Sequence, residues 1–231
     1  MSEKAFASET KRAPGRALVI SGGSVDEALA LRFFREESLL PSLTVAADRG
    51  LEFFAAHGIK PDIIVGDFDS AGSGLPEKYA QDPSVEILRY IPEKDSTDTE
   101  LALAAAIGRG FAGIDLLGAT GTRLDHVCGN IQLLSWAAAR GAQVRILDPH
   151  NRVCLKQEPF VIRRDLQWGS FISLFAYGGP VTGLTLRGFK YETENLLLTT
   201  GETRGVSNEI TAEEGHVSFT SGSLLVMETK D

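Results

Sequence analysis

The sequence predicts an α/β protein in two parts: a doubly wound, mostly parallel sheet, followed by a small antiparallel β-sandwich. From Arg16 to about Pro149, short runs rich in Val, Ile and Leu alternate with helix-like stretches, as expected for parallel strands buried on both faces. After Pro149, strand-like runs follow one another between glycine-rich turns, with no helical period of useful length.

The first part is expected to alternate strands with helices along the chain. The strand candidates are residues 17–21, 43–47, 63–65, 85–89, 114–117 and 144–147. The helix candidates are residues 25–37, 51–57, 97–109 and 125–140. Ser24 with Glu27, and Thr97 with Glu100, have capping-box spacing, which predicts two helix starts.

The second part is expected to hold only strands. Its candidates are residues 152–156, 160–163, 170–176, 181–186, 216–220 and 224–228. We therefore predict a flexible, polar N-terminal arm at 1–14, an ATP-binding catalytic α/β domain at 15–149 and a β-sandwich at 150–231.

The bulk charge and cysteine content narrow the class of partner. A formal net charge of −8 argues against nucleic acid or an anionic membrane as the main partner. The two cysteines make no disulfide framework, which favours the cytoplasm, and no apolar run approaches membrane-spanning length. An anionic substrate would need a local cluster of arginine, lysine and metal.

Polar loops follow the predicted parallel strands at their carboxyl ends, where open α/β sheets bind ligands. After the first strand come Ser21, Gly22 and Gly23, and after the second comes Asp48. We expect these loops to meet the later ones along one edge of the sheet.

Asp67 and Asp69 follow the third strand two positions apart. In extended backbone such side chains point the same way, so both carboxylates can share one Mg²⁺ ion with phosphate oxygens. Taken alone, the pair is equally consistent with a solvated turn, a haloacid-dehalogenase-type phosphatase or a metal-binding glycosyltransferase loop.

Two further groups extend this candidate site. Lys94, Asp95, Thr97 and Asp98 surround a helix start, and taken alone this segment is better explained by a cap and by acids that complement the helix dipole. The turn through Gly118, Thr120 and Gly121 can offer backbone N–H groups to phosphate, with Arg123 as a fork-shaped cation and Asp125 beside it. Together the groups describe a metal–nucleotide site suited to phosphoryl-type transfer.

Taken together, these motifs resemble those of the thiamine pyrophosphokinase family, and they look more like the bacterial members than the eukaryotic ones. Five motifs occur in family order: Ala-Asp-Arg-Gly at 47–50, Gly-Asp-Phe-Asp-Ser at 66–70, Lys-Asp-Ser-Thr-Asp-Thr-Glu at 94–100, the run 118–126, and Gly-Val-Ser-Asn-Glu at 205–209.

The resemblance implies transfer of the pyrophosphoryl group of ATP to the hydroxyl of thiamine, giving thiamine diphosphate and AMP. It implies Mg²⁺ and phosphates near Asp67, Asp69, Asp95 and Asp98. Asp48, Arg123 and Asp125 would lie near the nucleotide phosphates or the reacting hydroxyl, and Ser207 and Asn208 near the thiamine rings. A homodimer with thiamine between the α/β domain of one chain and the β domain of the other is also implied.

Two departures from the family pattern leave alternatives open. Thr122 stands where the family often has glycine, and residues 224–227 lack the tryptophan that eukaryotic members place beside thiamine. A phosphatase with Asp67 as nucleophile and Asp69 as acid, or a non-catalytic nucleotide- or thiamine-binding module, are the competing interpretations. The phosphatase leaves the loop from Gly118 unexplained.

Overall fold

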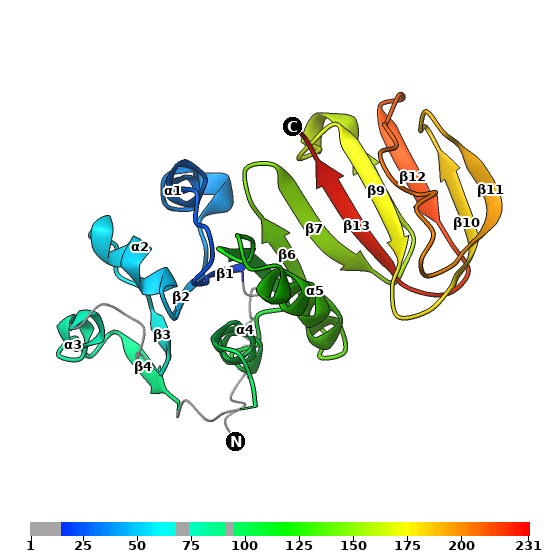
Figure 1. Cartoon of the computed structure of the whole chain (residues 1–231). Coiled ribbons are helices and arrows are strands. Elements are labelled where there is room, and N and C mark those ends of the chain that lie inside the picture. Colours follow the sequence, from blue (N-terminus) through cyan, green and yellow to red (C-terminus); the bar gives the residue numbers. More distant parts are fainter. Residues whose placement is uncertain (1–14, 68–73, 91–94) are drawn as a thin grey trace, which may run out of the picture.

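A large sheet carries both halves of the chain. The computed structural model describes residues 15–67, 74–90 and 95–231, so Asp69, Lys94 and the expected arm at 1–14 lie outside the described residues. The strands of this sheet are β1 (Ala17–Ile20), β2 (Leu43–Ala47), β3 (Ile63–Gly66), β4 (Glu86–Arg89), β5 (Gly113–Leu117), β6 (Gln143–Leu147), β7 (Asn151–Lys156), β9 (Phe171–Ala176) and β13 (Leu224–Thr229). Their order is β4-β3-β2-β1-β5-β6-β7-β13-β9 (Figure 1).

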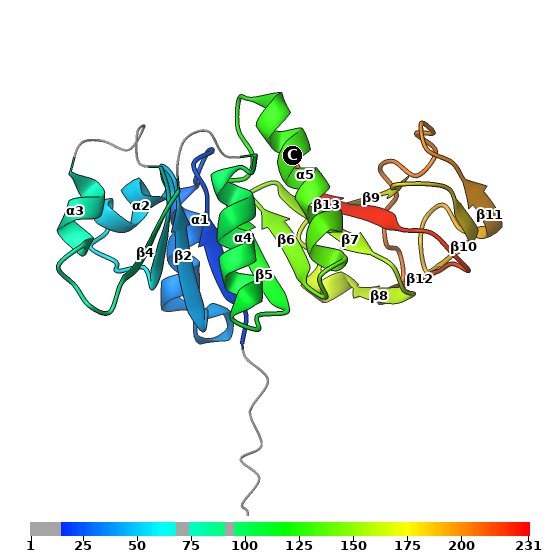
Figure 2. The same cartoon turned by 90° about the horizontal axis from the view of Figure 1, so that it is seen from below.

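The first six strands are parallel, as predicted, and helices cover both of their faces. The helices are α1 (Glu27–Arg35), α2 (Gly50–Ala56), α3 (Leu75–Tyr79), α4 (Asp98–Gly108) and α5 (Leu124–Ala138), with short 3₁₀ turns η1 (Glu37–Leu39) and η2 (Arg164–Leu166). Apolar cores lie between the sheet and α1 and α2 on one face, and between the sheet and α4 and α5 on the other. Figure 2 shows α4 and α5 side by side in front of the strands.

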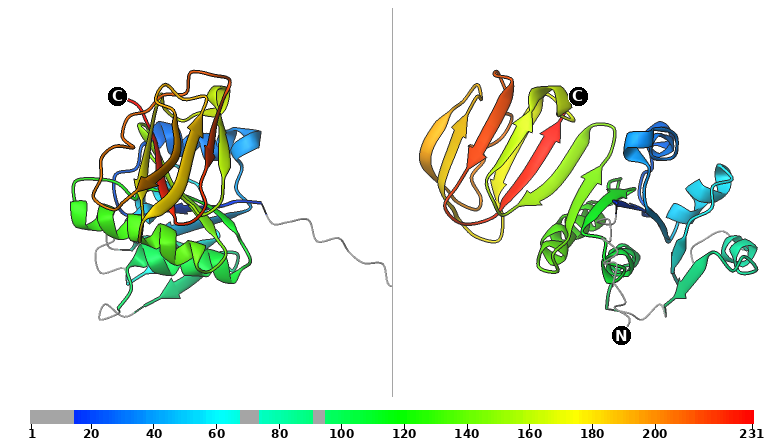
Figure 3. Two further views of the ribbon diagram at one scale, coloured as in Figure 1. Left: turned by 90° about the vertical axis from the view of Figure 1, so that its right-hand side faces the viewer. Right: turned by 180° about the vertical axis from the view of Figure 1, so that it is seen from behind.

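The predicted sandwich is confirmed, and one of its two sheets is the continuation of the large sheet. β6 pairs with β7 in antiparallel register, and β13 and β9 follow. The second sheet holds β8 (Phe160–Arg163), β10 (Val181–Arg187), β11 (Thr193–Leu198) and β12 (Glu214–Ser218), in the order β11-β10-β12-β8. A separate apolar core fills the space between the sheets. The molecule is elongated, with the sandwich at one end (Figure 3).

Three local predictions need correction. α1 is capped by Asp26, whose side chain accepts from the Leu29 N–H at 2.8 Å, so Ser24 is not its cap. Asp26 lies one residue before the first helical turn, as an N-cap must. β11 and the short helix α3 were not expected. Because β6 and β7 pair in one sheet on either side of the bend at positions 149 and 150, the domain limit there stays a prediction. None of the described helices is long and apolar enough to cross a bilayer.

A buried carboxylate ties the middle of the sheet together. Asp115 on β5 is 3% exposed, and it accepts hydrogen bonds from Arg16 Nε at 2.8 Å and Arg145 Nε at 2.6 Å. Burial alone would raise the pKa of Asp115, but the bonds from Arg145 and Arg16 outweigh it and lower that pKa. Asp115 therefore stays ionised and links β1, β5 and β6.

Replacing Asp115 with Asn should lower the free energy of unfolding by about 2–4 kcal/mol, because two guanidinium groups lose their charged partner. Since the folded pKa is depressed, the stabilisation is present above the ordinary carboxyl pKa and is lost as pH falls through the folded value. Urea unfolding at several pH values measures this. Asp165→Asn, at a surface ion pair, is the control and should change little. An Asp115→Asn chain as stable as wild type would contradict the assignment.

Candidate active site

The order of the parallel strands creates one topological switch point. From β1 the chain proceeds to β2, β3 and β4 on one side, then returns to place β5 on the other side of β1. The loops that leave β1 and β5 at their carboxyl ends therefore diverge to opposite faces of the sheet, where such folds bind ligands. These are the loop 21–26, before α1, and the loop 118–123, before α5.

The two loops are joined by backbone hydrogen bonds. Ser21 donates to the carbonyl of Leu117 at 2.9 Å, Gly23 to that of Gly118 at 2.8 Å and Ser24 to that of Thr120 at 2.8 Å. An ideal Cβ at Gly23 would lie 2.4 Å from the Gly118 oxygen, so only glycine allows this approach. The loops form one rigid unit at the switch point.

Gly118 completes this junction from the other side. It has a φ of +65°, in the left-handed region that favours glycine, and a Cβ there would lie 2.3 Å from the carbonyl oxygen of Ser21. Thr122, by contrast, is not among the described residues with positive φ, so its Cβ does not strain the turn. The replacement of the family's glycine by Thr122 therefore causes no positive-φ strain in the backbone of the turn.

The buried side chain of Ser21 forms a hydrogen bond to a helix of the same domain. Its hydroxyl is 2.6 Å from the hydroxyl of Thr99 on α4, and both residues are buried. This bond connects the loop after β1 to α4, which begins directly after Thr97. Direct contact of Ser21 with ATP stays a prediction.

Asp48 lies against the same unit from the neighbouring strand. It is half-buried with a φ of +49°, unusual for a residue with a side chain, and such strain is characteristic of functional loops. A Cβ at Gly22 would lie 2.9 Å from Asp48 Oδ2, so the carboxylate lies close to the backbone of Gly22. The structure thus brings together Gly22, Gly23, Asp48 and Gly118, as predicted from their places after three strands.

The remaining acids follow β3 and surround the start of α4. Asp67 is half-buried, Asp95 is exposed and Asp98 is the half-buried first residue of α4. Thr97 caps α4, since its hydroxyl accepts from the Glu100 N–H at 3.2 Å, which confirms the capping interpretation. Within the described ranges, no group of three acidic, histidine or cysteine side chains is close enough to hold a metal ion. Asp69 lies outside those ranges, so the four-carboxylate metal site stays a prediction.

Arg123 and Asp125 form an exposed ion pair at the start of α5. Arg123 Nη2 is 2.6 Å from Asp125 Oδ2, and Nε is 3.2 Å from Oδ1. The bond from Arg123, together with one from the His126 N–H, lowers the pKa of Asp125 to about 2. While it is paired, Asp125 is therefore a weak base. Arg123 occupies the N-cap position and makes no side-chain cap, whereas α1 and α4 are both capped by side chains.

Asn208 is buried in the sandwich, and its side chain forms hydrogen bonds there. It is 7% exposed, and its Oδ1 accepts from the N–H of Tyr191 at 3.0 Å while its Nδ2 donates to the Tyr191 carbonyl at 2.8 Å. With its backbone held in this way, Tyr191 is 64% exposed. Beside it, Ser207 is exposed with a φ of +57°, and its N–H donates to Ser173 Oγ on β9 at 3.0 Å. Tyr191 was not expected as a site residue.

The missing C-terminal tryptophan has a structural consequence. Leu224, Leu225 and Val226 on β13 are buried in the sheet between β7 and β9. The stretch contains no aromatic side chain, whereas hydrogen bonds hold Tyr191 beside Asn208.

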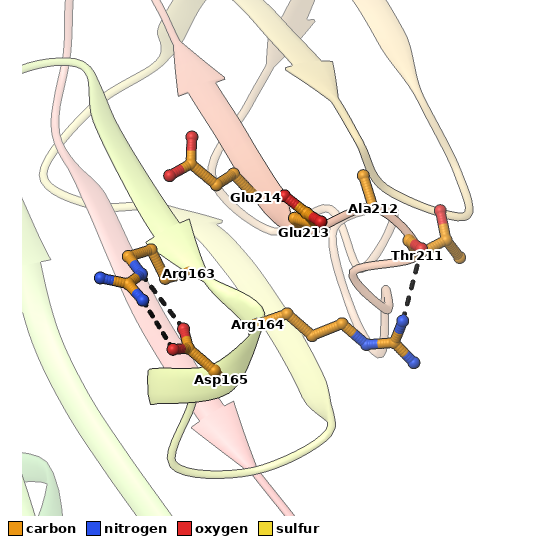
Figure 4. A pocket seen from close by; sticks show the side chains of 7 residues that line it. All are labelled: Arg163, Arg164, Asp165, Thr211, Ala212, Glu213 and Glu214. Carbon is orange, nitrogen blue, oxygen red and sulfur yellow. Dashed lines mark hydrogen bonds and ion pairs between the residues drawn. The ribbon is translucent and has the colours of Figure 1, made fainter.

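One cavity in the described part of the chain lies away from all of these residues. It has a volume of ≈ 800 Å³ and lies between the end of β8 and the start of β12 (Figure 4). Arg163 is paired there with Asp165 at 2.6 Å, and Arg164 reaches the Thr211 carbonyl at 3.5 Å. Its charges largely neutralise one another, and it contains none of the predicted site residues. The lining residues are Arg163, Arg164, Asp165, Thr211, Ala212, Glu213 and Glu214.

Replacing Gly23 with Ala should push the two switch-point loops apart, because the new methyl group meets the Gly118 and Thr120 carbonyl oxygens at 2.4 and 2.5 Å. We expect a loss of stability of about 1–3 kcal/mol from this overpacking, measured by urea unfolding. Gly108→Ala, in a helix with open space around it, is the control and should be neutral or slightly stabilising. Equal stabilities for the two variants would refute the close approach.

Comparison with known proteins identifies the family. The model "Thiamin pyrophosphokinase, catalytic domain" matches residues 38–146, and the model "Thiamin pyrophosphokinase, vitamin B1 binding domain" matches residues 160–224. Thiamine pyrophosphokinase of Bacillus subtilis is 31% identical over 215 residues, covering 92% of this chain and 98% of the relative.

Solved structures agree in fold over nearly the whole chain. The crystal structure of thiamine pyrophosphokinase from Bacillus subtilis has a TM-score of 0.81 at 29% identity, covering 94% of this chain and 100% of that one. The structure from Geobacillus thermodenitrificans has a TM-score of 0.79 at 30% identity, covering 93% and 97%. The phosphatase and the non-catalytic module find no support in these matches, and the chain belongs to the thiamine pyrophosphokinase family, enzymes that transfer the pyrophosphoryl group of ATP to thiamine.

Proposed function

We propose that this chain binds the phosphates of ATP at the switch point, on the turn 118–121 and the start of α5. The observation that carries this is a helix whose N-cap residue, Arg123, makes no side-chain cap, beginning directly after a glycine turn at the sheet's switch point. The N–H groups in the first turn of a helix lack intrahelical acceptors, and with the helix dipole they favour an anion. Arg123 stands at that point and supplies a fork-shaped cation.

The reaction then proceeds by in-line displacement. The hydroxyl oxygen of thiamine attacks the β-phosphorus of ATP, and a new O–P bond forms. The bond from the β-phosphorus to the bridging oxygen of the α-phosphate breaks, and AMP leaves with that oxygen. The hydroxyl proton passes to a base. Asp125 does not serve while Arg123 lowers its pKa to about 2, so Arg123 must move to the phosphates before Asp125 can accept a proton.

Mg²⁺ fits the donor chemistry of the acidic loops. Asp67, Asp69, Asp95 and Asp98 offer only carboxylate oxygens, the ligands that this ion prefers alongside phosphate oxygens. When bound, the ion neutralises charge on the phosphates. Asp67 and Asp98 are half-buried, which suits side chains that hold an ion close to the protein surface.

Thiamine is proposed to bind against Ser207 and the Tyr191 ring, with Asn208 holding Tyr191 and Ser173 holding Ser207. An exposed aromatic ring suits a flat heterocycle, and thiamine is a cation, which adds attraction to the face of the ring. The exposure of Tyr191, 64%, leaves room for this contact.

The sheet separates this thiamine surface from the acids. From β3, which carries Asp67, to β9, against which Ser207 lies, the order β3-β2-β1-β5-β6-β7-β13-β9 contains seven steps between neighbours. At about 4.8 Å per step, this is on the order of 30 Å. A molecule of two small rings does not bridge that distance. We therefore propose a homodimer whose sites combine the acids of one protomer with the sandwich of the other. We also propose that the enzyme works in the cytoplasm.

The identity of the products tests the reaction. With ATP labelled at the α-phosphate, the label should appear in AMP, and with label at the γ-phosphate it should appear in thiamine diphosphate.

Asp67→Asn should lower the rate by on the order of 10²–10³, because a charge-stabilising group is lost. Asp165→Asn should match wild type. Labelled ADP together with thiamine monophosphate would contradict the proposed transfer.

A mixed dimer tests the composite site. One chain carries Asp67→Asn and the other carries Tyr191→Ala, and each homodimer is expected to be nearly inactive. With sites shared between protomers, one site collects both defects and the other none, so about half of the wild-type activity returns. With sites inside one chain, every site keeps a defect and activity stays near zero. Leu197→Ala, another exposed apolar residue of the sandwich, is the control for Tyr191→Ala and should keep full activity.

A further inference from the structure

One buried polar side chain faces the proposed phosphate turn and has no assigned role. Asn130 lies on α5 and is 8% exposed. Its Nδ2 donates to the carbonyl of Ala119, itself 3% exposed, at 2.8 Å. Apolar residues Leu133, Leu134 and Ala137 follow it on the same buried stripe, so an amide at this position replaces a core residue.

With this bond, three successive carbonyls of the turn are held by donors from the protein. Gly118 accepts from the Gly23 N–H and Thr120 from the Ser24 N–H, each at 2.8 Å, and Ala119 accepts from Asn130 between them. The first two donors come from the loop after β1, and the third comes from α5. Each carbonyl fixes the plane of one peptide unit.

The N–H groups of the same peptide units are thereby oriented. In a planar trans peptide the N–H points opposite to the carbonyl, so the Ala119 carbonyl fixes the direction of the Thr120 N–H. Within the described ranges, the N–H groups of Ala119, Thr120 and Gly121 donate to no other residue. Successive N–H groups held in this way form an anion-binding concavity.

We propose that Asn130 is a positioning residue for phosphate binding: it locks the peptide between Ala119 and Thr120 so that the Thr120 N–H faces the ATP phosphates. The inference rests on the proposed placement of ATP at this turn. Asn130 does not touch the substrate, because its amide is buried behind the turn. Without its donor, the Ala119 carbonyl is left unsatisfied and that peptide is free to rotate.

The test compares Asn130→Leu with Leu133→Ala, a core change one turn along the same helix. Affinity is measured by calorimetry for α,β-methylene ATP with Mg²⁺, in which the bond that should break cannot, and separately for thiamine. Asn130→Leu should weaken binding of the ATP analogue by about 10- to 100-fold. Its affinity for thiamine should stay within about twofold of wild type. Leu133→Ala should lower the melting temperature while keeping affinity for the analogue.

Asn130→Asp serves as a second variant, since it keeps the shape but presents an oxygen in place of the donor. It should show the same selective loss for the analogue. If either folded variant binds the analogue as wild type does, or if Leu133→Ala weakens the analogue equally, the positioning role is wrong.

A measurement on the wild-type protein covers the case in which both variants fail to fold. The backbone amide resonances of Ala119, Thr120 and Gly121 should shift when the ATP analogue is added, and should not shift with thiamine alone. If Thr120 does not respond to the analogue, the placement of ATP fails and this inference fails with it. If Thr120 responds but the folded variants bind normally, only the role of Asn130 is rejected.

Discussion

The close backbone approach between the loops after β1 and β5 is the constraint on which the site depends. Gly23 and Gly118 allow it, because a methyl group at either position would meet a carbonyl oxygen at 2.4 Å or less. The approach turns two loops that leave opposite faces of the sheet into one unit. Asp48 lies against that unit, and the bond between Ser21 and Thr99 connects it to the helix that follows the acidic loop.

Much of this arrangement could be predicted because the ends of the parallel strands can be recognised in the sequence. The Val, Ile and Leu runs located the parallel strands within a few residues, and the polar residues that follow them, such as Asp48 and Gly118, meet at one edge as expected. The edge strand β11 was missed because its exposed residues lack an apolar alternation. The cap of α1 was misplaced because Ser24 and Asp26 are both good capping residues and the spacing to Glu27 favoured Ser24.

Two residues that hold the site were missed for a common reason. Thr99 precedes Ala102, Leu103 and Ala106 on the buried stripe of α4, and Asn130 precedes Leu133, Leu134 and Ala137 on that of α5. A polar residue at the first position of an apolar stripe is the available signal, because a buried polar group needs a partner. The sequence does not show which residue the partner is, because it lies far along the chain: Ser21 is 78 residues from Thr99. The place of Asn208 near the thiamine rings stays a prediction, but its amide holds Tyr191, whose exposed ring was not expected.

The central claim is that ATP and thiamine meet where the switch point of one protomer faces the sandwich of another. A crystal structure with α,β-methylene ATP, Mg²⁺ and thiamine tests it most directly. The account predicts phosphates against the N–H groups of the turn 118–121, and thiamine against the Tyr191 ring of a second protomer. Both substrates bound within a single protomer, or the nucleotide lodged in the cavity beside Arg163 and Arg164, would contradict it.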